Sequence, residues 1–261
     1  MASQPKKAVP SPALGAGLHH LGHTRTTFQR DHALLTPDSF VRAPLPGMTR
    51  ATAIVHTSPA MGAAFTQYTA EIETGGSIGP AATQRFLYVI EGEIALQAGG
   101  KKHALVADGY AFTPAGVDSR VTGKRAARVA VIEKSYEALK GAPGPKMGIG
   151  SEKDVEAQPL MGDKALGVRS LLPDDPAYDF AVNTMTYEPG ASLAMVEAHV
   201  MEHGLLMLQG EGIYRLGDSW YPVSAGDFIW MGPYCPQWFG ALGKIPAKYL
   251  IYKPWNRHPL G

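Results

Sequence analysis

The sequence predicts an all-β fold of two tandem β-barrels or jelly rolls, and three observations support this. First, 30 Gly and 21 Pro make up about a fifth of the 261 residues, against an ordinary combined share of about 12%. They lie between short apolar runs, as turns between strands do. Second, helical periodicity is weak along the whole chain. Third, the chain repeats itself, which indicates two copies of one module.

The repeat is clearest where an apolar run meets a glycine turn. Residues 86–94 (FLYVIEGEI) resemble residues 205–213 (LLMLQGEGI), with their turn glycines 118 positions apart. Residues 108–116 (DGYAFTPAG) likewise resemble residues 225–233 (AGDFIWMGP), at an offset of 117. A module of about 115 residues has the size of one small domain.

The repeat divides the chain into four parts. Residues 1–30 are expected to form a flexible N-terminal arm, residues 31–139 the first barrel, and residues 153–261 the second barrel. Residues 140–152 are dense in Pro and Gly, so we expect them to link the two barrels.

The arm shows no targeting signal. Its early lysines are followed by Pro and Gly instead of the apolar stretch of a signal peptide. No run of 18 apolar residues exists that could span a bilayer. These observations predict a cytoplasmic protein. His19, His20 and His23 of the arm could bind a metal ion weakly.

Charge and cysteine content exclude several classes of protein. Lys and Arg (24) nearly balance Asp and Glu (23), which gives no electrostatic case for binding nucleic acid. The single Cys235 cannot form an internal disulfide, so a secreted disulfide scaffold and a CxxC metal site are excluded. We expect a small-molecule substrate, neither nucleic-acid nor membrane partners, and a homo-oligomer.

The second copy contains an E-x-H-x3-H pattern formed by Glu197, His199 and His203. Along one strand, side chains at i, i+2 and i+6 share a face, so all three would point into the barrel. A carboxylate and two imidazoles suit Mn, Fe, Co, Ni or Zn. Gln237 could add an amide oxygen and leave one or two positions for substrate or water. The pattern therefore predicts a divalent metal site in the second barrel.

The first copy lacks this pattern. Residues 79–85 (GPAATQR) contain neither His nor an acid, and Arg85 and Arg120 fall opposite His203 and Gln237. The fold is thus expected in both halves and the metal in one. We expect the first barrel to act as scaffold, interface or active-site wall.

The spacing of these motifs resembles the cupin family, whose usual first motif is H-x-H-x3–4-E with a further His in the second motif. Here Glu197 takes the first His position, His203 takes the Glu position, and Gln237 takes the last His position. This departure argues against a generic dioxygenase or oxalate oxidase.

Four segments in order resemble the (S)-ureidoglycine aminohydrolase family of bicupins. They are RDHALLTPD (30–38), EAHVMEHG (197–204), GDFIWMGPY (226–234) and YLIYKPWNR (249–257). The resemblance runs from about residue 24 to the C-terminus. It implies a bicupin that hydrolyses (S)-ureidoglycine to (S)-ureidoglycolate and ammonia in purine breakdown.

The same resemblance implies roles for particular residues. It assigns Glu197, His199, His203 and Gln237 as Mn²⁺ ligands, and Glu197 and Gln237 as contacts to the substrate as well. It places Tyr249, Lys253 and Tyr214 at the substrate. Lys253 and Glu197 are the catalytic candidates, with Lys253 recognising the carboxylate or transferring a proton.

Other functions stay open at this point. Another metal-dependent cupin enzyme, such as a dioxygenase or a sugar-phosphate isomerase, would use the same ligand types. A non-catalytic bicupin that stores nitrogen or binds a small ligand would need no metal. A transcriptional regulator would need a helix-turn-helix pattern and a basic patch, and the sequence contains neither.

Overall fold

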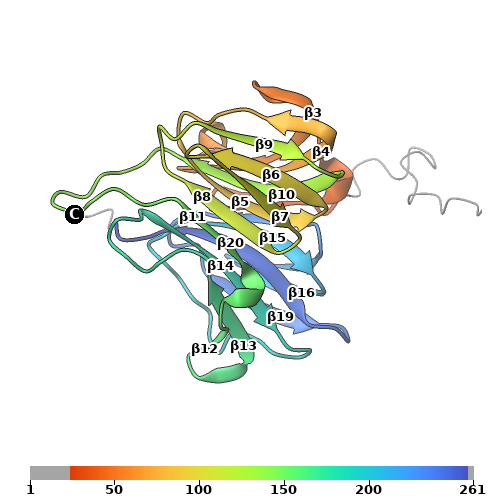
Figure 1. The fold of residues 1–261 in the computed structure, drawn as a ribbon. Coiled ribbons are helices and arrows are strands. Elements are labelled where there is room, and N and C mark those ends of the chain that lie inside the picture. Colours follow the sequence, from red (N-terminus) through yellow and green to blue (C-terminus); the bar gives the residue numbers. More distant parts are fainter. Residues whose placement is uncertain (1–23, 258–261) are drawn as a thin grey trace, which may run out of the picture.

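The computed structural model describes residues 24–257, which form twenty strands joined by turns and short 3₁₀ helices (Figure 1). The all-β prediction is confirmed. The predicted metal-binding histidines of the arm, His19, His20 and His23, lie outside the described residues. No helix among residues 24–257 has the length and apolar character needed to cross a membrane.

The first half is built mainly from strands of residues 48–151. These strands are β3 Met48–Thr57, β4 Thr66–Ile78, β5 Gln84–Glu91, β6 Glu93–Ala98, β7 Lys101–Val106, β8 Gly109–Thr113, β9 Ser119–Gly123, β10 Ala127–Lys134 and β11 Gly148–Ser151. They form one nine-stranded antiparallel sheet in the order β11-β8-β5-β10-β4-β9-β6-β7, with β3 beside β4. The long β4 carries the sheet from one layer of the barrel to the other.

The second half repeats this plan with two separate sheets. Its strands are β1 Thr27–Phe28, β2 His32–Leu35, β12 Gln158–Leu160, β13 Asp163–Ser170, β14 Phe180–Tyr187, β15 His203–Gln209, β16 Glu211–Leu216, β17 Ser219–Ser224, β18 Phe228–Met231, β19 Gln237–Leu242 and β20 Ala247–Pro254. The large layer has the order β1-β2-β18-β15-β20-β14-β13-β12, and the small layer has the order β17-β16-β19.

The hydrogen-bond register shows the duplication directly. Arg85 pairs with Thr113 in the first half, and His203 pairs with Met231 in the second, at the same offset of 118 residues. The expected match of Arg120 to Gln237 is wrong by one residue. Gln237 pairs with Leu216, and the equivalent pair in the first half is Ser119 with Ala98.

Two strands pair across the domain boundaries predicted from the sequence. Strand β2, which lies within residues 31–139 of the predicted first barrel, pairs with β18 of the second. Strand β11, which lies entirely within the predicted linker 140–152, pairs with β8 of the first barrel. Long-range backbone pairing therefore ties the two halves into one body.

Alternation along the central strands creates three apolar layers. In β15, Leu205 and Met207 belong to the core of the second barrel, whereas Leu206 belongs to the interface between the barrels. The same interface contains Phe65 and Tyr252, whose ring centroids lie 3.9 Å apart. One face of each large layer thus fills a barrel and the other face packs against its partner, as period-two strands require.

The turn glycines of the repeat are required by close backbone approach. Gly92 and Gly210 both have φ above +70°. A Cβ at Gly92 would lie 2.1 Å from the Ala126 carbonyl oxygen, and one at Gly210 would lie 2.7 Å from that of Pro246. Neither position can accept a side chain without moving the neighbouring strand.

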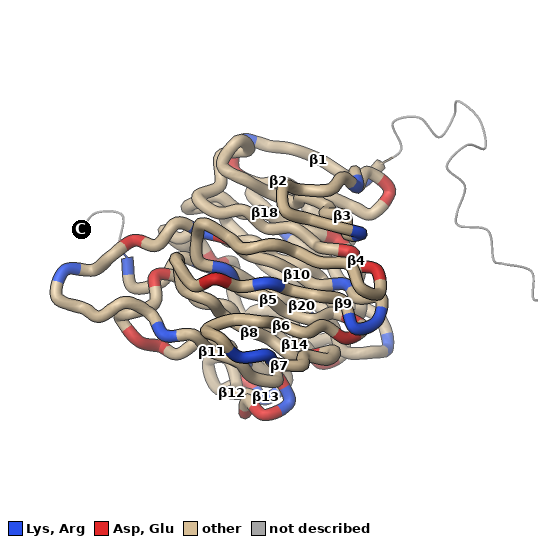
Figure 2. Tube along the Cα trace, turned by 45° about the horizontal axis from the view of Figure 1, so that its top comes forward, with Lys and Arg blue, Asp and Glu red and all other residues tan. Residues whose placement is uncertain are grey.

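Charged side chains are distributed without a single-sign field. Figure 2 shows Lys and Arg interspersed with Asp and Glu along the loops and strand ends. Two ion pairs join the two halves of the chain. Lys134 lies 2.7 Å from Asp179, and Lys248 lies 2.6 Å from Glu152. These pairs stabilise the packing of one half against the other.

Candidate metal centre in the second barrel

The four predicted metal ligands line one cavity of about 420 Å³ inside the second barrel. His203 is the first residue of β15, and Gln237 is the first residue of β19. Glu197 forms an isolated backbone bridge with Gln237, in which each N–H donates to the other's carbonyl oxygen at 2.8 Å. This bridge places the Glu197 and Gln237 side chains next to each other.

The expected single strand through Glu197, His199 and His203 is not formed. Strand β15 begins only at His203, while Glu197 and His199 lie in the loop that follows β14. Tyr234 fixes this loop, because its N–H donates to the His199 carbonyl oxygen at 2.6 Å. Contacts with a distant segment therefore bring the side chains to one cavity.

The ligand side chains approach one another in pairs. His199 Nε2 lies 3.2 Å from Glu197 Oε2, and the ring centroids of His199 and His203 are 5.3 Å apart. The hydroxyl of Tyr214, on β16, donates to Gln237 Oε1 at 3.2 Å. The donors thus surround the cavity with oxygen and nitrogen atoms.

The protonation state of His203 suits metal ligation. Burial lowers the pKa of His203 to about 3, and the charges of His199 and Lys253 act in the same direction. His203 is therefore neutral, as a metal-ligating imidazole must be, and its buried Nδ1 has no hydrogen-bond partner among residues 24–257. One carboxylate, two imidazoles and an amide oxygen fit a divalent transition metal.

Lys253 lies on β20 with its side chain toward the same cavity. Burial lowers its pKa below the usual value, although the charges of Asp174 and Glu197 oppose this shift. Its Nζ lies 4.2 Å from the centroid of the Trp255 ring. The aromatic ring therefore holds the ammonium at the cavity in place of a carboxylate partner.

The predicted tyrosines are buried parts of the cavity wall. The Tyr249 hydroxyl lies 2.8 Å from the Tyr187 hydroxyl and 3.3 Å from the Met185 sulfur. Burial raises the pKa of Tyr249 and of Tyr214 well above the usual value, so both stay protonated. Their hydroxyls are thus already engaged with protein groups.

Sequence reasoning missed one strand of the wall. Asn183 and Met185 of β14 line the cavity, and Tyr187 follows them at the same period of two. Strand β14 pairs with β20, so that these positions lie opposite Ile251, Tyr249 and Ala247. Reading the alternation of residues 180–187 against that of residues 247–254 would have found them.

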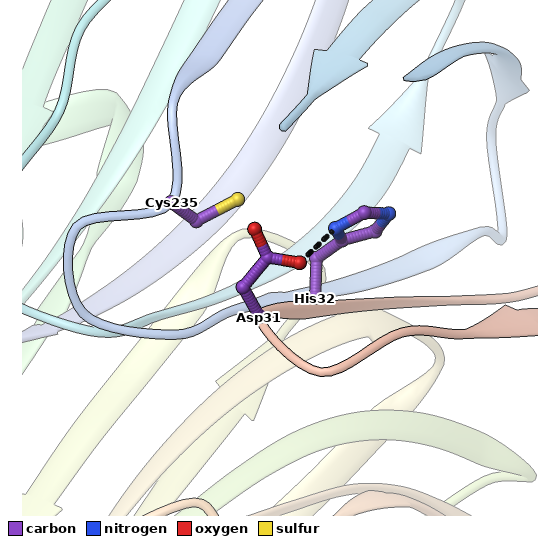
Figure 3. Close-up of side chains that lie close together, drawn as sticks. All are labelled: Asp31, His32 and Cys235. Atoms are coloured by element: carbon purple, nitrogen blue, oxygen red, sulfur yellow. Dashed lines mark hydrogen bonds and ion pairs between the residues drawn. The ribbon is translucent and has the colours of Figure 1, made fainter. Parts of the chain in front are cut away.

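A second cluster lies beside residues 232–236, the loop that precedes Gln237. Donor atoms of Asp31, His32 and Cys235 lie within 4.8 Å of one another (Figure 3). Glu197, His199 and His203 are spread more widely around their cavity. Both ring nitrogens of His32 are engaged, with Nδ1 2.9 Å from Asp31 Oδ1 and Nε2 2.9 Å from the Tyr221 hydroxyl.

Backbone contacts of this cluster hold the loop of residues 232–236, which precedes Gln237. The Asp31 carbonyl oxygen accepts the N–H of Gly232 at 2.7 Å, five residues before Gln237. The N-terminal motif 30–38 thus has a structural role in the second barrel, and a cation there would have to displace two hydrogen bonds of His32.

The first barrel holds an ion pair where the second holds His203. Arg85 Nε donates to Glu133 Oε1 at 2.8 Å, and its Nη1 donates to the Gly79 carbonyl oxygen at 2.8 Å. Arg85 is 4% exposed, so the guanidinium fills the position of the ligand. The described part of the first barrel therefore has an Arg–Glu ion pair at this position in place of a metal ligand.

Comparison with known families agrees with this architecture. Residues 60–136 match the EutQ-like cupin domain, and residues 183–252 match the Cupin domain. At 10% identity and a TM-score of 0.66, Bacillus subtilis oxalate decarboxylase shares the fold over 89% of this chain and 79% of its own.

Closer relatives cover most of the chain. The (S)-ureidoglycine aminohydrolase of Arabidopsis thaliana is 41% identical over 92% of this chain and 80% of its own length. That of Escherichia coli (strain K12) is 32% identical over 86% and 88%. The crystal structure of Ylba from E. coli superposes with a TM-score of 0.81 at 29% identity, covering 92% and 98%. A putative glyoxylate-induced protein from Pseudomonas aeruginosa gives a TM-score of 0.83 at 32% identity, covering 90% and 93%. The chain is therefore a bicupin and belongs to the (S)-ureidoglycine aminohydrolase family.

Proposed function

We propose that this protein hydrolyses (S)-ureidoglycine to (S)-ureidoglycolate and ammonia with a divalent metal, Mn²⁺, in the second barrel. One observation carries the proposal. Glu197, His199, His203 and Gln237 line the same cavity as Lys253. The cavity thus combines a metal-type donor set with a cation for the substrate's carboxylate, and the relatives named (S)-ureidoglycine aminohydrolase support the substrate.

When bound, the metal would supply electrophilic activation of the substrate. Glu197, His199, His203 and Gln237 would hold it. Their oxygen and nitrogen donors are of the kind that Mn²⁺ prefers. The first barrel would contribute the packed wall behind β14, β15 and β20.

The residues of the chain would divide the work of binding and proton transfer. The Lys253 ammonium would pair with the substrate carboxylate. Water forms a C–O bond at the carbon whose C–N bond breaks. Glu197 would accept the proton released by water and return it to the departing amine, which leaves as ammonia. No electrons are gained or lost overall.

Tyr249, Tyr214 and Met185 would keep bulk water from the reacting carbon. The two hydroxyls are already hydrogen-bonded and protonated, so they present the cavity with ring faces and no free charge. Excluding water from this side of the cavity would strengthen the electrostatic contacts that Lys253 and Glu197 make with the substrate.

The test is ammonia release from (S)-ureidoglycine generated immediately before use. An enzyme-free control is required because the compound decays spontaneously. The reaction is run without oxygen, with protein stripped of metal and with protein reloaded with Mn²⁺. Ammonia above the control only with reloaded protein supports the proposal. Turnover that requires oxygen would indicate a dioxygenase, and no ammonia above the control would contradict hydrolysis.

A homo-oligomer in the cytoplasm completes the proposal. Trp220 is 58% exposed and Leu242 is 49% exposed, and both lie on the small layer of the second barrel. An interface there would remove this apolar surface from water. Light scattering on the protein and on Trp220→Ser tests this, and an equally monomeric species for both would contradict it.

A further inference from the structure

The cavity of the second barrel contains one amide that has no role in the proposed chemistry. Asn183 lies in the middle of β14, opposite Ile251 of β20. Phe180 and Val182 of β14 belong to the interface core. Asn183, on the alternate face, therefore points into the second barrel.

The register places Asn183 between two candidate substrate-binding positions. Lys253 pairs with Ala181, and Tyr249 pairs with Met185, on either side of the Asn183–Ile251 pair. Diagonal neighbours on one face of an antiparallel pair are about 7–8 Å apart. One small substrate could therefore contact both Asn183 and Lys253.

The polar atoms of the Asn183 side chain are available to a ligand. It is half-buried and makes no hydrogen bond to any other described residue, although it lines the cavity. The other polar side chains of the cavity do have protein partners: Glu197 contacts His199, and Tyr214 donates a hydrogen bond to Gln237. Desolvating a polar amide without a partner costs free energy, which a ligand with matching groups would recover.

Amide chemistry indicates which part of the substrate would be matched. A carboxamide offers one oxygen acceptor and an NH₂ donor, whereas Lys253 offers only donors and ionised Glu197 only acceptors. A ureido group is planar and neutral, with a carbonyl acceptor beside an NH₂ donor. The two groups can form a pair of parallel hydrogen bonds.

We infer that Asn183 binds the ureido group of the substrate and thereby distinguishes it from a simple acylamino group. This inference rests on the proposed function. Lys253 would then hold the carboxylate, while Glu197 and Gln237 remain for the reacting amine. Asn183 fixes which substituent of the central carbon faces the metal side of the cavity.

Two stable ligands test this without turnover. Hydantoate carries a carboxylate and a ureido group, and N-acetylglycine replaces the terminal NH₂ by a methyl group. Their dissociation constants are measured by calorimetry on Mn²⁺-loaded protein, for the natural chain, Asn183→Leu and Asn183→Asp. Gln209→Leu, which removes an exposed amide at the far end of β15, is the control.

The natural chain and Gln209→Leu should bind hydantoate roughly tenfold more tightly than N-acetylglycine, since one additional hydrogen bond distinguishes the ligands. In Asn183→Leu this preference should fall to about twofold or less. Asn183→Asp has nearly the same volume and keeps an oxygen acceptor but loses the amide donor, so it should bind both ligands more weakly.

Equal preference in the natural chain and Asn183→Leu, with both variants folded by circular dichroism, would overturn the inference. Failure of the proposed function gives a different result, namely no ammonia from the natural chain in the turnover assay. Since ligand binding is measured separately, the two failures can be distinguished. Should Asn183→Leu fail to fold, the Asn183→Asp comparison decides alone, and unchanged binding of both ligands would overturn the inference.

Discussion

Replacing the two equivalent residues of the duplicated halves separates metal binding from stability. His203 and Arg85 occupy the same register position, His203 as the first residue of β15 and Arg85 as the second residue of β5. We predict that His203→Ala loses the metal and keeps the fold, whereas Arg85→Met keeps the metal and loses stability.

The structure sets the size of each effect. Arg85 is 4% exposed, and its removal leaves Glu133 and the Gly79 carbonyl without the guanidinium. Breaking a buried pair by removing one partner costs about 3–5 kcal/mol. We expect about 3 kcal/mol, because Glu133 is 23% exposed and keeps the Tyr68 hydroxyl at 3.0 Å.

His203 should show the opposite behaviour. Its buried Nδ1 has no hydrogen-bond partner among residues 24–257, and the space left by Ala joins the existing cavity. We expect about 1 kcal/mol of destabilisation, the typical value for a single substitution. Its metal affinity should fall more than about 100-fold, beyond the loss typical of a residue that only supports a ligand.

Two measurements check this pair of variants. Urea unfolding gives the change in free energy, and elemental analysis after dialysis gives the metal bound per chain. Metal retained by His203→Ala at the natural level would refute the assignment of the site. Loss of metal from folded Arg85→Met would show that the first barrel takes part in holding the ion.

Three further predictions follow from individual contacts. Lys253→Met should raise KM about 10–100-fold, because it removes a charge-assisted hydrogen bond to the carboxylate; steady-state kinetics with an unchanged KM would contradict this. Tyr187→Phe removes the hydroxyl 2.8 Å from that of Tyr249 and should lower the free energy of unfolding by about 1 kcal/mol, with denaturant curves as the readout. Burial lowers the pKa of His56 to about 3, whereas an unfolded histidine titrates near 6.5. The unfolded chain therefore binds the additional proton as pH falls below about 6.5, and stability drops by up to about 1.4 kcal/mol per pH unit. His56→Phe, which can keep the stack on Phe228, should show a shallower pH dependence in urea titrations, and an identical slope would rule out this source.

The fold could be predicted from the sequence because each copy of the repeat carries the same local pattern. Apolar runs and turn glycines recur at a constant spacing, and Gly92 and Gly210 occupy equivalent turns in the structure. The pairing of a strand near the N-terminus with the second barrel could not be predicted. Strand β2 pairs with β18 nearly 200 residues away, and no local pattern in residues 32–35 specifies that partner.

The sequence predicted which residues line the site but not which backbone elements carry them. The spacing of Glu197, His199 and His203 fits one strand, yet a loop carries the first two. The bridge between Glu197 and Gln237 sets that loop, and such a contact leaves no periodic signal. Asn183 was missed for a different reason, since its strand alternates regularly but its partner strand had to be known first.

Stoichiometric reconstitution tests the central proposal most directly. Metal-free protein is titrated with Mn²⁺ while ammonia release from freshly made (S)-ureidoglycine is followed, with the enzyme-free rate subtracted. The account predicts that activity rises in proportion to bound metal and stops rising at one ion per chain, with His203→Ala inactive throughout. Full activity in the metal-free protein, or a plateau at two ions per chain, would contradict it.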